Sequence, residues 1–390
     1  MTGSPLDRRA FLKSGGLLAL GLAATPARAQ SRGGAEPERA GPLFYVGTYT
    51  EDMGHGEGIY LYRLDPASGA LTALGVTHGV RNPSFLALGP GGRHLYAVNE
   101  YAKGTGAVSA FAVDPATAAL TLLNQRSSEG AAPCHVVVDQ RGNFVLVANY
   151  VSGTASVLPV RPDGSLGPAV EVVQHRGTGP NKERQEGPHV HCVALSPDQR
   201  FAIVCDLGID RLKIYRFDSD RGSLAAAGEV EVHGGEGPRH FVFHPTGRFG
   251  YLITEMGSTL TAYEYDPARG ALQEIQKISS LPSGFSGHND AAEIEVSVDG
   301  RFLYASNRGS NDVAVVALDP TTGRMSAIQH QPTGGDWPRH FAIDPSGRFL
   351  LVANERSGDI VVFPRDPLSG RLAASVAKAR VPNPVCIRFL

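Results

Sequence analysis

The sequence predicts an all-β fold, a seven-bladed β-propeller whose closing blade takes strands from both ends of the chain. Three observations predict this fold. A segment of similar pattern occurs six times at intervals of about 50 residues, each copy reads as four short strands, and the final residues repeat the start of a copy. Units of this length bury their faces by stacking on their neighbours, and four-stranded units at this interval are propeller blades.

The six copies align on the turn between their first and second strands. The turn positions are Gly92, Gly142, Gln199, Gly247, Gly300 and Gly347. An apolar run precedes each turn and another follows it, as in HFVFHP and FGYLITE on either side of TGR. A polar loop, an alternating strand and a DPARGAL-type turn come next, and Asp followed by Pro favours a type I turn. The pattern therefore predicts four antiparallel strands in every copy.

The two ends of the chain supply the seventh unit. Residues 383–390, NPVCIRFL, match NPSFLALG at the start of the first copy, so they predict an inner strand. Residues 43–76 carry the pattern of three more strands. Pairing these segments closes the ring and removes open sheet edges that would invite aggregation. The predicted propeller domain is therefore residues 43–390.

Residues 1–29 read as an export signal that is separate from the propeller. Arg8 and Arg9 precede a short apolar stretch, and a small-x-small cleavage box ends at Ala29. This order is typical of a signal peptide, and the paired arginines indicate the Tat route. The alternative, a membrane anchor, requires a longer apolar stretch than this one. We expect cleavage near Ala29, a flexible tether over residues 30–42, and a periplasmic or secreted protein with no membrane attachment in its mature form.

Charge excludes some classes of partner. The formal net charge is −2, and the predicted signal removes four basic residues and one acidic residue. The mature chain therefore has no excess of basic residues with which to bind nucleic acid or an anionic membrane. An anionic ligand would have to be held by a local cluster. The sequence leaves the oligomeric state open.

The four cysteines lie in apolar strand contexts and read as buried thiols rather than as a disulfide framework. They are Cys134, Cys192, Cys205 and Cys386. Cys192 and Cys205 flank one turn symmetrically, so we expect them to face each other, and a bond between them after export is the alternative. Their spacing with histidine does not resemble a zinc site, and we expect no metal or cofactor.

Candidate functional residues lie where the first strand of each copy starts and where the second ends. Hairpin geometry places these positions at one face, and the innermost strands line the channel. The strand starts carry His135, His189, His191, Arg239, His240, Glu293, Arg339 and His340. The strand ends carry Asn99, Glu100, Asn149, Asp206, Glu255, Asn307, Arg308, Asn354 and Glu355. Ionisable groups gathered at one water-filled mouth are costly unless they are paired or used, so this ring is a site candidate.

Structural roles are the alternative for parts of this ring. The repeated asparagines read as turn residues that bond to neighbouring backbone, and the histidines could join one blade to the next. Other chemistries fit poorly, because a G-x-S-x-G elbow, a P-loop and an aspartate-rich calcium loop are all missing from the sequence. Arginine, histidine and glutamate together suit activation of water beside an anionic substrate.

The chain resembles the seven-bladed propeller lactonases, the propeller-type 6-phosphogluconolactonases, which are similar to fungal carboxymuconate-lactonising propellers. The resemblance covers residues 43–390 and rests on strings such as YVGTYT, GTGPNKERQEGPHVHCV, GPRHFVFHP and AEIEVSVDGRFLYASNRG. It implies a lactone-directed site. The matching positions are His191 (or His189), Arg239, Glu255 and Arg308. The remaining ring residues are expected to bind the substrate: His135, His189, His240, Glu293, Arg339, His340 and Glu355.

A hydrolytic mechanism follows as a hypothesis. Glu255 or His191 takes a proton from water, and the water attacks the lactone carbonyl. Arg239 and Arg308 stabilise the oxyanion.

Arg339 and His340 would hold a phosphate or carboxylate elsewhere on the substrate. Export favours an unphosphorylated aldonolactone over a phosphorylated one, which is a cytosolic metabolite. Two alternatives stay open: an exported propeller that binds a ligand without turnover, and a cycloisomerase that lactonises a muconate-like diacid.

Overall fold

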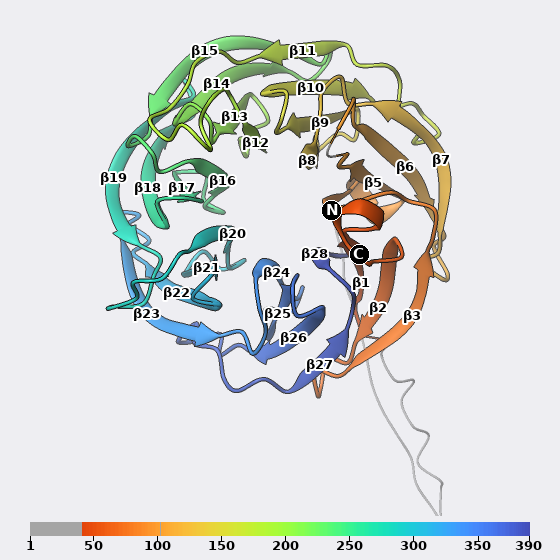
Figure 1. Ribbon diagram of the computed structural model, residues 1–390, viewed down its shortest axis with the longest axis vertical. Helices are drawn as coiled ribbons and strands as arrows, with labels where there is room; N and C mark the ends of the chain where they lie inside the picture. The colour runs from red at the N-terminus through yellow and green to blue at the C-terminus, as the bar shows by residue number, and fades with distance from the viewer. Residues whose placement is uncertain (1–40, 102) are drawn as a thin grey trace, which may run out of the picture. The chain divides into compact units, whose positions relative to one another are not determined.

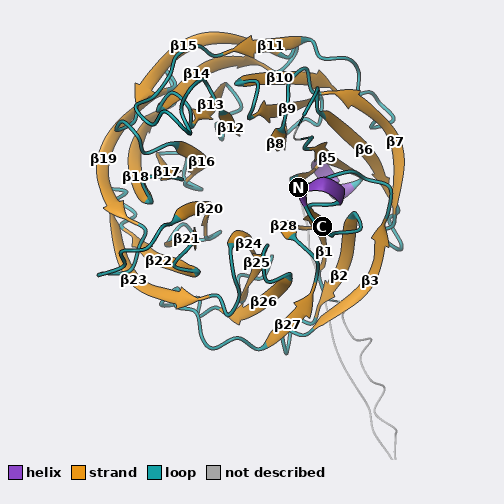
Figure 2. Ribbon diagram, viewed as in Figure 1, coloured by secondary structure: helices purple, strands orange, loops and turns teal. Residues whose placement is uncertain are grey.

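The computed structural model describes residues 41–101 and 103–390. The predicted signal over residues 1–29, with Arg8, Arg9 and the cleavage position at Ala29, lies outside the described residues, as does most of the predicted tether. In the described part, 28 strands form seven four-stranded antiparallel sheets. Figure 1 shows the sheets placed radially as blades in a ring, and Figure 2 shows how little besides strands and loops the ring contains. The predicted seven-bladed propeller is confirmed.

The closing blade, blade 7, takes strands from both ends of the chain. It consists of β28 (Pro384–Phe389), β1 (Leu43–Thr48), β2 (Ile59–Leu64) and β3 (Leu71–Thr77). In its register Tyr45 lies opposite Arg388 and Val46 lies opposite Ile387. The blue strand β28 is innermost and lies beside the red-orange strand β1 (Figure 1). The composite closure is therefore confirmed.

Each of the other blades is one continuous stretch of chain. Blade 1 holds β4 (Leu86–Leu88), β5 (His94–Asn99), β6 (Ala107–Val113) and β7 (Leu120–Ser127). Blade 2 holds β8 (Pro133–Val138), β9 (Phe144–Asn149), β10 (Thr154–Pro159) and β11 (Glu171–Gln174). Blade 3 holds β12 (Val190–Leu195), β13 (Phe201–Asp206), β14 (Arg211–Asp218) and β15 (Ser223–Glu231).

The second half of the ring repeats this order. Blade 4 holds β16 (Pro238–Phe243), β17 (Phe249–Thr254), β18 (Thr259–Asp266) and β19 (Ala271–Ser279). Blade 5 holds β20 (Asp290–Val296), β21 (Phe302–Arg308), β22 (Asp312–Leu318) and β23 (Met325–Pro332). Blade 6 holds β24 (Pro338–Ile343), β25 (Phe349–Asn354), β26 (Asp359–Pro364) and β27 (Ala377–Arg380). Two short 3-10 helices, η1 (Glu51–Met53) and η2 (Pro90–Gly92), complete the described elements.

Turn chemistry explains where the strands end. Gly247 adopts a φ of 71°, the left-handed region that glycine enters without strain, and its amide donates to the His244 carbonyl at 2.8 Å. At the outer turn Asp266 Oδ1 accepts from the amides of Ala268 and Arg269 at 2.8 Å and 3.2 Å. This is the side-chain bond that aspartate supplies at the first position of such turns, as the sequence predicts.

The core lies between neighbouring blades. The second strand of blade 4, β17, is buried along its whole length, whereas the outermost strand β19 has no buried residue and alternates between partly and fully exposed. Tyr251 and Ile253 of blade 4 pack in one cluster with Leu303 of blade 5. Burying side chains of this size stabilises the fold by about 1.5–3 kcal/mol each. Apolar packing between blades therefore sets the positions of the inner strands.

Register irregularities recur where inner strands begin. The pairing shifts between Pro133 and His135, Val190 and Cys192, Pro238 and His240, Ala291 and Ile294, and Pro338 and His340. A β-bulge re-aims the side chains beside it. In blade 4 the consecutive residues Arg239 and His240 both reach polar partners in the channel, which a regular strand would not permit.

All four cysteines are buried and free. Cys192 and Cys205 lie opposite each other in the pairing of β12 with β13, as predicted. In the part of the chain that the structure describes, no helix is long and apolar enough to cross a membrane.

Candidate active site

The site candidate is a cavity of about 300 Å³ at the mouth of the channel. From the ring predicted by the sequence it brings together Glu100, His191, Glu255, Arg308 and Arg339. These residues come from five different blades. Hairpin geometry places each of these residues at the same face, and the ring of blades brings them together.

Glu255, which follows β17, lies at the centre of an ion cluster. Its Oε2 accepts hydrogen bonds from Arg239 Nε at 2.9 Å and from Arg308 Nη2 at 2.8 Å. Its Oε1 accepts one from Arg184 Nη2 at 2.5 Å. The glutamate side chain is 7% exposed. The mouth was expected to be water-filled, but at Glu255 the cluster is buried.

Electrostatics keep Glu255 ionised, as expected. Burial alone would raise the pKa of this carboxyl, but the guanidinium groups of Arg308 and Arg239 outweigh burial and hold the pKa well below its usual range. Because both carboxylate oxygens already accept strong hydrogen bonds, proton abstraction from water by Glu255 is disfavoured.

His191 is the other candidate base, and its ring is unprotonated. Burial, together with the positive charge of Arg239, holds the pKa of His191 well below its usual value, so the imidazole is neutral at pH 7. Its Nε2 lies 3.8 Å from Glu255 Oε2, and its Nδ1 lies 3.8 Å from Cys134 Sγ. The distance to Glu255 is longer than a good hydrogen bond, whereas the contact of Nδ1 with the larger sulfur atom is a hydrogen bond. The ring therefore has a nitrogen, Nε2, that a substrate or water could engage.

Backbone carbonyls anchor two of the arginines. Arg239 Nη1 donates to the Ala292 carbonyl at 2.8 Å. Arg308 donates from Nε to the Asp290 carbonyl at 3.0 Å and from Nη2 to the Ala291 carbonyl at 3.3 Å. Burial lowers the pKa of Arg308 to about 10, which still leaves it charged at neutral pH. These two cations are preorganised by the start of blade 5.

Arg339 belongs to a second polar group on the cavity wall. Its Nη2 donates to the Tyr49 hydroxyl at 2.8 Å, and Glu355 Oε2 lies 3.9 Å from its Nε. Tyr49 donates to Glu100 Oε2 at 3.0 Å, and Ser84 donates to the same oxygen. Burial raises the pKa of Glu100. In this group Glu355 is the carboxylate that pairs with Arg339.

The predicted histidines separate into two levels. His135, His240, His340 and Glu293 line a second cavity of about 240 Å³. Its lining also includes Phe241 and residues further along the inner strands, so it lies deeper in the channel. Arg339 lines the mouth cavity and His340 lines the deeper one, and the expectation that together they hold one anionic group of the substrate stays a prediction.

Hydrogen bonds assign the tautomers in the deeper cavity. The Ile387 amide donates to His340 Nδ1 at 3.3 Å, so the ring proton is on Nε2, which lies 3.2 Å from Glu293 Oε2. Arg239 Nη1 lies 3.2 Å from His240 Nε2, so the His240 proton is on Nδ1, 3.3 Å from Glu293. Burial lowers the pKa of His340 to about 3 and that of His240 well below normal, so both rings are neutral. Through His240, this group contacts the guanidinium of Arg239 from the deeper cavity.

Two further histidines make structural contacts. His189 stacks on Tyr150 with ring centroids 4.5 Å apart, and its nitrogens face the Tyr150 carbonyl and Glu186. His135, which also lines the deeper cavity, has its ring centroid 4.4 Å from that of Phe85, with the two rings tilted by 36°. Of the two histidines in the PHVH string, His191 is the one that lines the mouth cavity.

Three of the four asparagines at the strand ends bond to neighbouring backbone, as predicted, and all four also bond to side chains. Asn99, Asn149 and Asn307 donate to the carbonyls of Arg81, Ser128 and Ser280. Asn354 donates instead to the side chain of Asp359.

Sequence reasoning missed several residues of the mouth cavity: Cys134, Tyr150, Arg184, Asp290 and Trp337. Arg184 lies in the loop between β11 and β12, which has no counterpart at a repeated position. Trp337 precedes β24 and adopts a φ of 67°, with its amide bonded to Asn311 Oδ1 at 2.9 Å. Within the described ranges, no group of three or more His, Cys, Asp or Glu is arranged to hold a metal ion.

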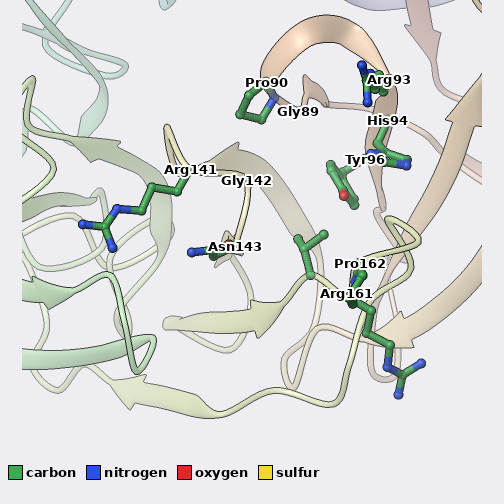
Figure 3. A pocket seen from close by; sticks show the side chains of 11 residues that line it. Gly89, Pro90, Arg93, His94, Tyr96, Arg141, Gly142, Asn143, Arg161 and Pro162 are labelled. Carbon is green, nitrogen blue, oxygen red and sulfur yellow. The ribbon is translucent and has the colours of Figure 1, made fainter.

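Another hollow, of about 290 Å³, lies at the opposite end of the strands, between the turns of blades 1 and 2. Arg141 and Arg161 line it, but Figure 3 shows their guanidinium groups directed away from each other. Arg141 is paired with Asp220 at 2.6 Å. The hollow therefore lacks the convergent polar groups that the mouth cavity has.

Comparison with known proteins identifies the family of this chain. The family model described as "Lactonase, 7-bladed beta-propeller" matches residues 43–389. The chain belongs to this lactonase family.

Relatives carry related names. The 6-phosphogluconolactonase of Bacillus subtilis is 40% identical over 346 residues, which cover 89% of this chain and 97% of the relative. A 6-phosphogluconolactonase from Formosa agariphila is 36% identical over 77% of this chain and 86% of its own length. The solved structure of a periplasmic gluconolactonase from Pseudomonas aeruginosa superposes with a TM-score of 0.85 at 36% identity, covering 90% of this chain and 99% of that one.

Proposed function

We propose that this chain is a sugar lactonase that hydrolyses an aldonolactone to the aldonic acid. The observation that carries the proposal is the mouth cavity, where neutral His191 lies beside the arginine-bound carboxylate of Glu255. Membership of the lactonase family and the names of the relatives support the same activity.

The mechanism begins at His191. The neutral imidazole takes a proton from water as the water oxygen attacks the lactone carbonyl. The Glu255 carboxylate, 3.8 Å away, stabilises the imidazolium that forms. The protonated ring then gives its proton to the ring oxygen of the lactone as the C–O bond breaks. General acid–base work of this kind contributes roughly 10²–10⁴-fold to the rate.

Glu255 has a positioning role in this proposal. It holds the guanidinium groups of Arg239 and Arg308, which keep the cavity positive where the carbonyl oxygen becomes an oxyanion. Such preorganised cations cost no reorganisation at the moment of reaction, and the loss of one donor costs about 10²–10³-fold.

The sugar part of the substrate would contact the remaining cavity wall. Asp290 and Glu100 offer carboxyl oxygens, and Tyr150 offers a hydroxyl, to the hydroxyl groups of a sugar ring. The arginines of the cavity already have carboxylate or hydroxyl partners. This balance favours an unphosphorylated lactone over one that brings two more negative charges.

The test is product analysis after incubating the purified protein with aldonolactones and phosphorylated aldonolactones, corrected for spontaneous hydrolysis. His191→Gln replaces one neutral side chain by another and should lower the catalysed rate at least roughly tenfold. Arg248→Ala, in an exposed turn at the far end of the strands, should leave the rate unchanged. Binding of a lactone without turnover by the unaltered protein would favour the ligand-binding alternative.

We also propose that the chain is exported to the periplasm by the Tat route. The motif around Arg8 and Arg9 supports this, as does the relationship to a protein named as periplasmic. Changing both arginines to lysine should leave precursor in the cytoplasm. Normal export of that variant, measured by cell fractionation, would contradict the Tat assignment.

A further inference from the structure

The arginines around Glu255 differ in how they are held. Arg239 and Arg308 donate to backbone carbonyls as well as to the carboxylate, and their side chains are 3% and 5% exposed. Arg184 is 37% exposed. Its other contacts are with side chains, the Tyr150 hydroxyl at 3.4 Å and Asp290 Oδ1 at 3.9 Å. Arg184 is therefore the cation of this cluster that can most readily change partner.

The loop that carries Arg184, residues 175–189, is itself firmly held. Asp206 clamps both of its ends, with Oδ2 bonded to His175 Nδ1 at 2.7 Å and Oδ1 accepting from the His189 amide at 2.7 Å. Gln185, beside Arg184, is buried and donates from Nε2 to the Leu207 carbonyl at 2.8 Å. Because the backbone is held at this point, the side chain of Arg184 is the part that can change position.

Departure of Arg184 would leave Glu255 paired with two cations. Arg184 uses Oε1 of the carboxylate, whereas Arg239 and Arg308 both use Oε2. The glutamate would therefore remain ionised, although its Oε1 would lose a hydrogen bond. Arg184 would in turn gain a new oxyanion partner in place of the carboxylate that it leaves.

We propose that Arg184 is a catalytic residue that leaves Glu255 for the negative charge formed on the substrate. That charge arises on the lactone carbonyl oxygen in the transition state and remains on the carboxylate of the aldonate product. Arg184 and His191 line the same cavity, so a carbonyl between them receives the nucleophile from one and a cation from the other. This inference rests on the proposed lactonase function and adds Arg184 to Arg239 and Arg308, the cations that stabilise the oxyanion within it.

If Arg184 binds the oxyanion, its loss should affect binding of the neutral lactone less than binding of the charged aldonate. The lactone carries no charge at its carbonyl before attack, so Arg184→Gln should change KM less than about threefold. It should lower kcat by about 10²–10³-fold, the cost of removing one oxyanion donor. The inhibition constant of the aldonate should rise at least tenfold. Arg184→Lys should recover part of kcat, because it keeps the charge but loses the planar fork.

Lys182→Gln is the matched control, since it removes the same charge from an exposed position of the same loop. It should leave kcat and product inhibition within about twofold of the unaltered protein. Thermal unfolding of Arg184→Gln should match that of the control, which separates a catalytic role from a structural one.

Product binding can be measured without turnover. Trp337 is the chain's one tryptophan and lines the mouth cavity, so its fluorescence should report titration with an aldonate. The inference is overturned if Arg184→Gln keeps full kcat, or if it binds the aldonate as tightly as the unaltered protein does. If the unaltered protein hydrolyses no lactone, the proposed function fails, and the fluorescence titration still decides whether Arg184 binds the carboxylate.

Discussion

His340 in the deeper cavity makes the stability of the propeller depend on pH in a way that can be isolated. The ring is 2% exposed and neutral, because burial lowers its pKa from 6.5 to about 3. In the unfolded chain the same ring takes up a proton below its ordinary pKa. Protons therefore favour the unfolded state, so the contribution of His340 is complete above pH 6.5 and is lost as the pH falls below it.

The size of the effect follows from the two pKa values. Between pH 7 and pH 5 the unfolded ring becomes almost fully protonated while the folded ring does not. The linkage relation then gives a loss of about 2 kcal/mol in the free energy of unfolding from this one side chain. Glu295 acts in the opposite direction, because burial raises its pKa to about 8. The change in the free energy of unfolding of the unaltered protein between pH 7 and pH 5 therefore does not isolate the contribution of His340.

The comparison is between the unaltered protein and His340→Gln, which retains a donor toward Glu293 but cannot be protonated. Urea unfolding of each at pH 7 and pH 5 gives two pH differences, and the variant should lack about 2 kcal/mol of the destabilisation by acid. His233→Gln, at an exposed position, should behave as the unaltered protein does. Equal pH differences for the unaltered protein and His340→Gln would refute the neutral, buried state of this ring.

Three further predictions concern the fold, the base and the thiols. Deleting residues 385–390 removes most of β28 and leaves one edge of β1 unpaired, so the chain should aggregate; a soluble product with unchanged melting would contradict the closure. Since His191 is neutral well below pH 6.5, kcat/KM should stay constant from pH 8 to pH 6, and an acid limb centred near 6.5 would refute this assignment. Titration of unfolded, unreduced protein should find four free thiols, whereas two would indicate a bond between Cys192 and Cys205.

Glu255→Gln would be a less clean test of the site. An exposed mouth would make the change nearly neutral for stability, but this carboxylate is 7% exposed and bonded to several guanidinium groups. Removing the charge of Glu255 would leave the buried guanidinium groups of Arg239 and Arg308 without their counter-ion, and such a loss costs about 3–5 kcal/mol. Loss of activity in that variant would mix a folding defect with a chemical one.

The fold could be predicted from the sequence because its signals are local and repeated. The closing strand could be predicted because NPVCIRFL is similar to NPSFLALG at the start of the first copy. The contact of Arg239 with Glu255 was also predictable, since a hairpin brings a strand start beside a strand end.

The depth of the histidines was not predictable. Alternation along a strand places neighbours on opposite faces, but a bulge at the start of β16 lets Arg239 and His240 both reach the channel. Arg184 was missed for a different reason. Its place depends on how residues 175–189 fold, and that is set by Asp206 and Gln185 rather than by a repeated pattern.

The walls of the mouth cavity come from separate blades. Glu100 belongs to blade 1, Glu255 to blade 4, Arg308 to blade 5 and Arg339 to blade 6. These groups are nevertheless joined across blades, because Arg308 bonds to Glu255 and the Tyr49 hydroxyl connects Arg339 with Glu100. A substitution at one wall therefore changes the partner that it has on another blade. A mutant library that seeks activity on a new sugar should vary the residues of each pair together, Glu255 with Arg308 and Glu100 with Arg339.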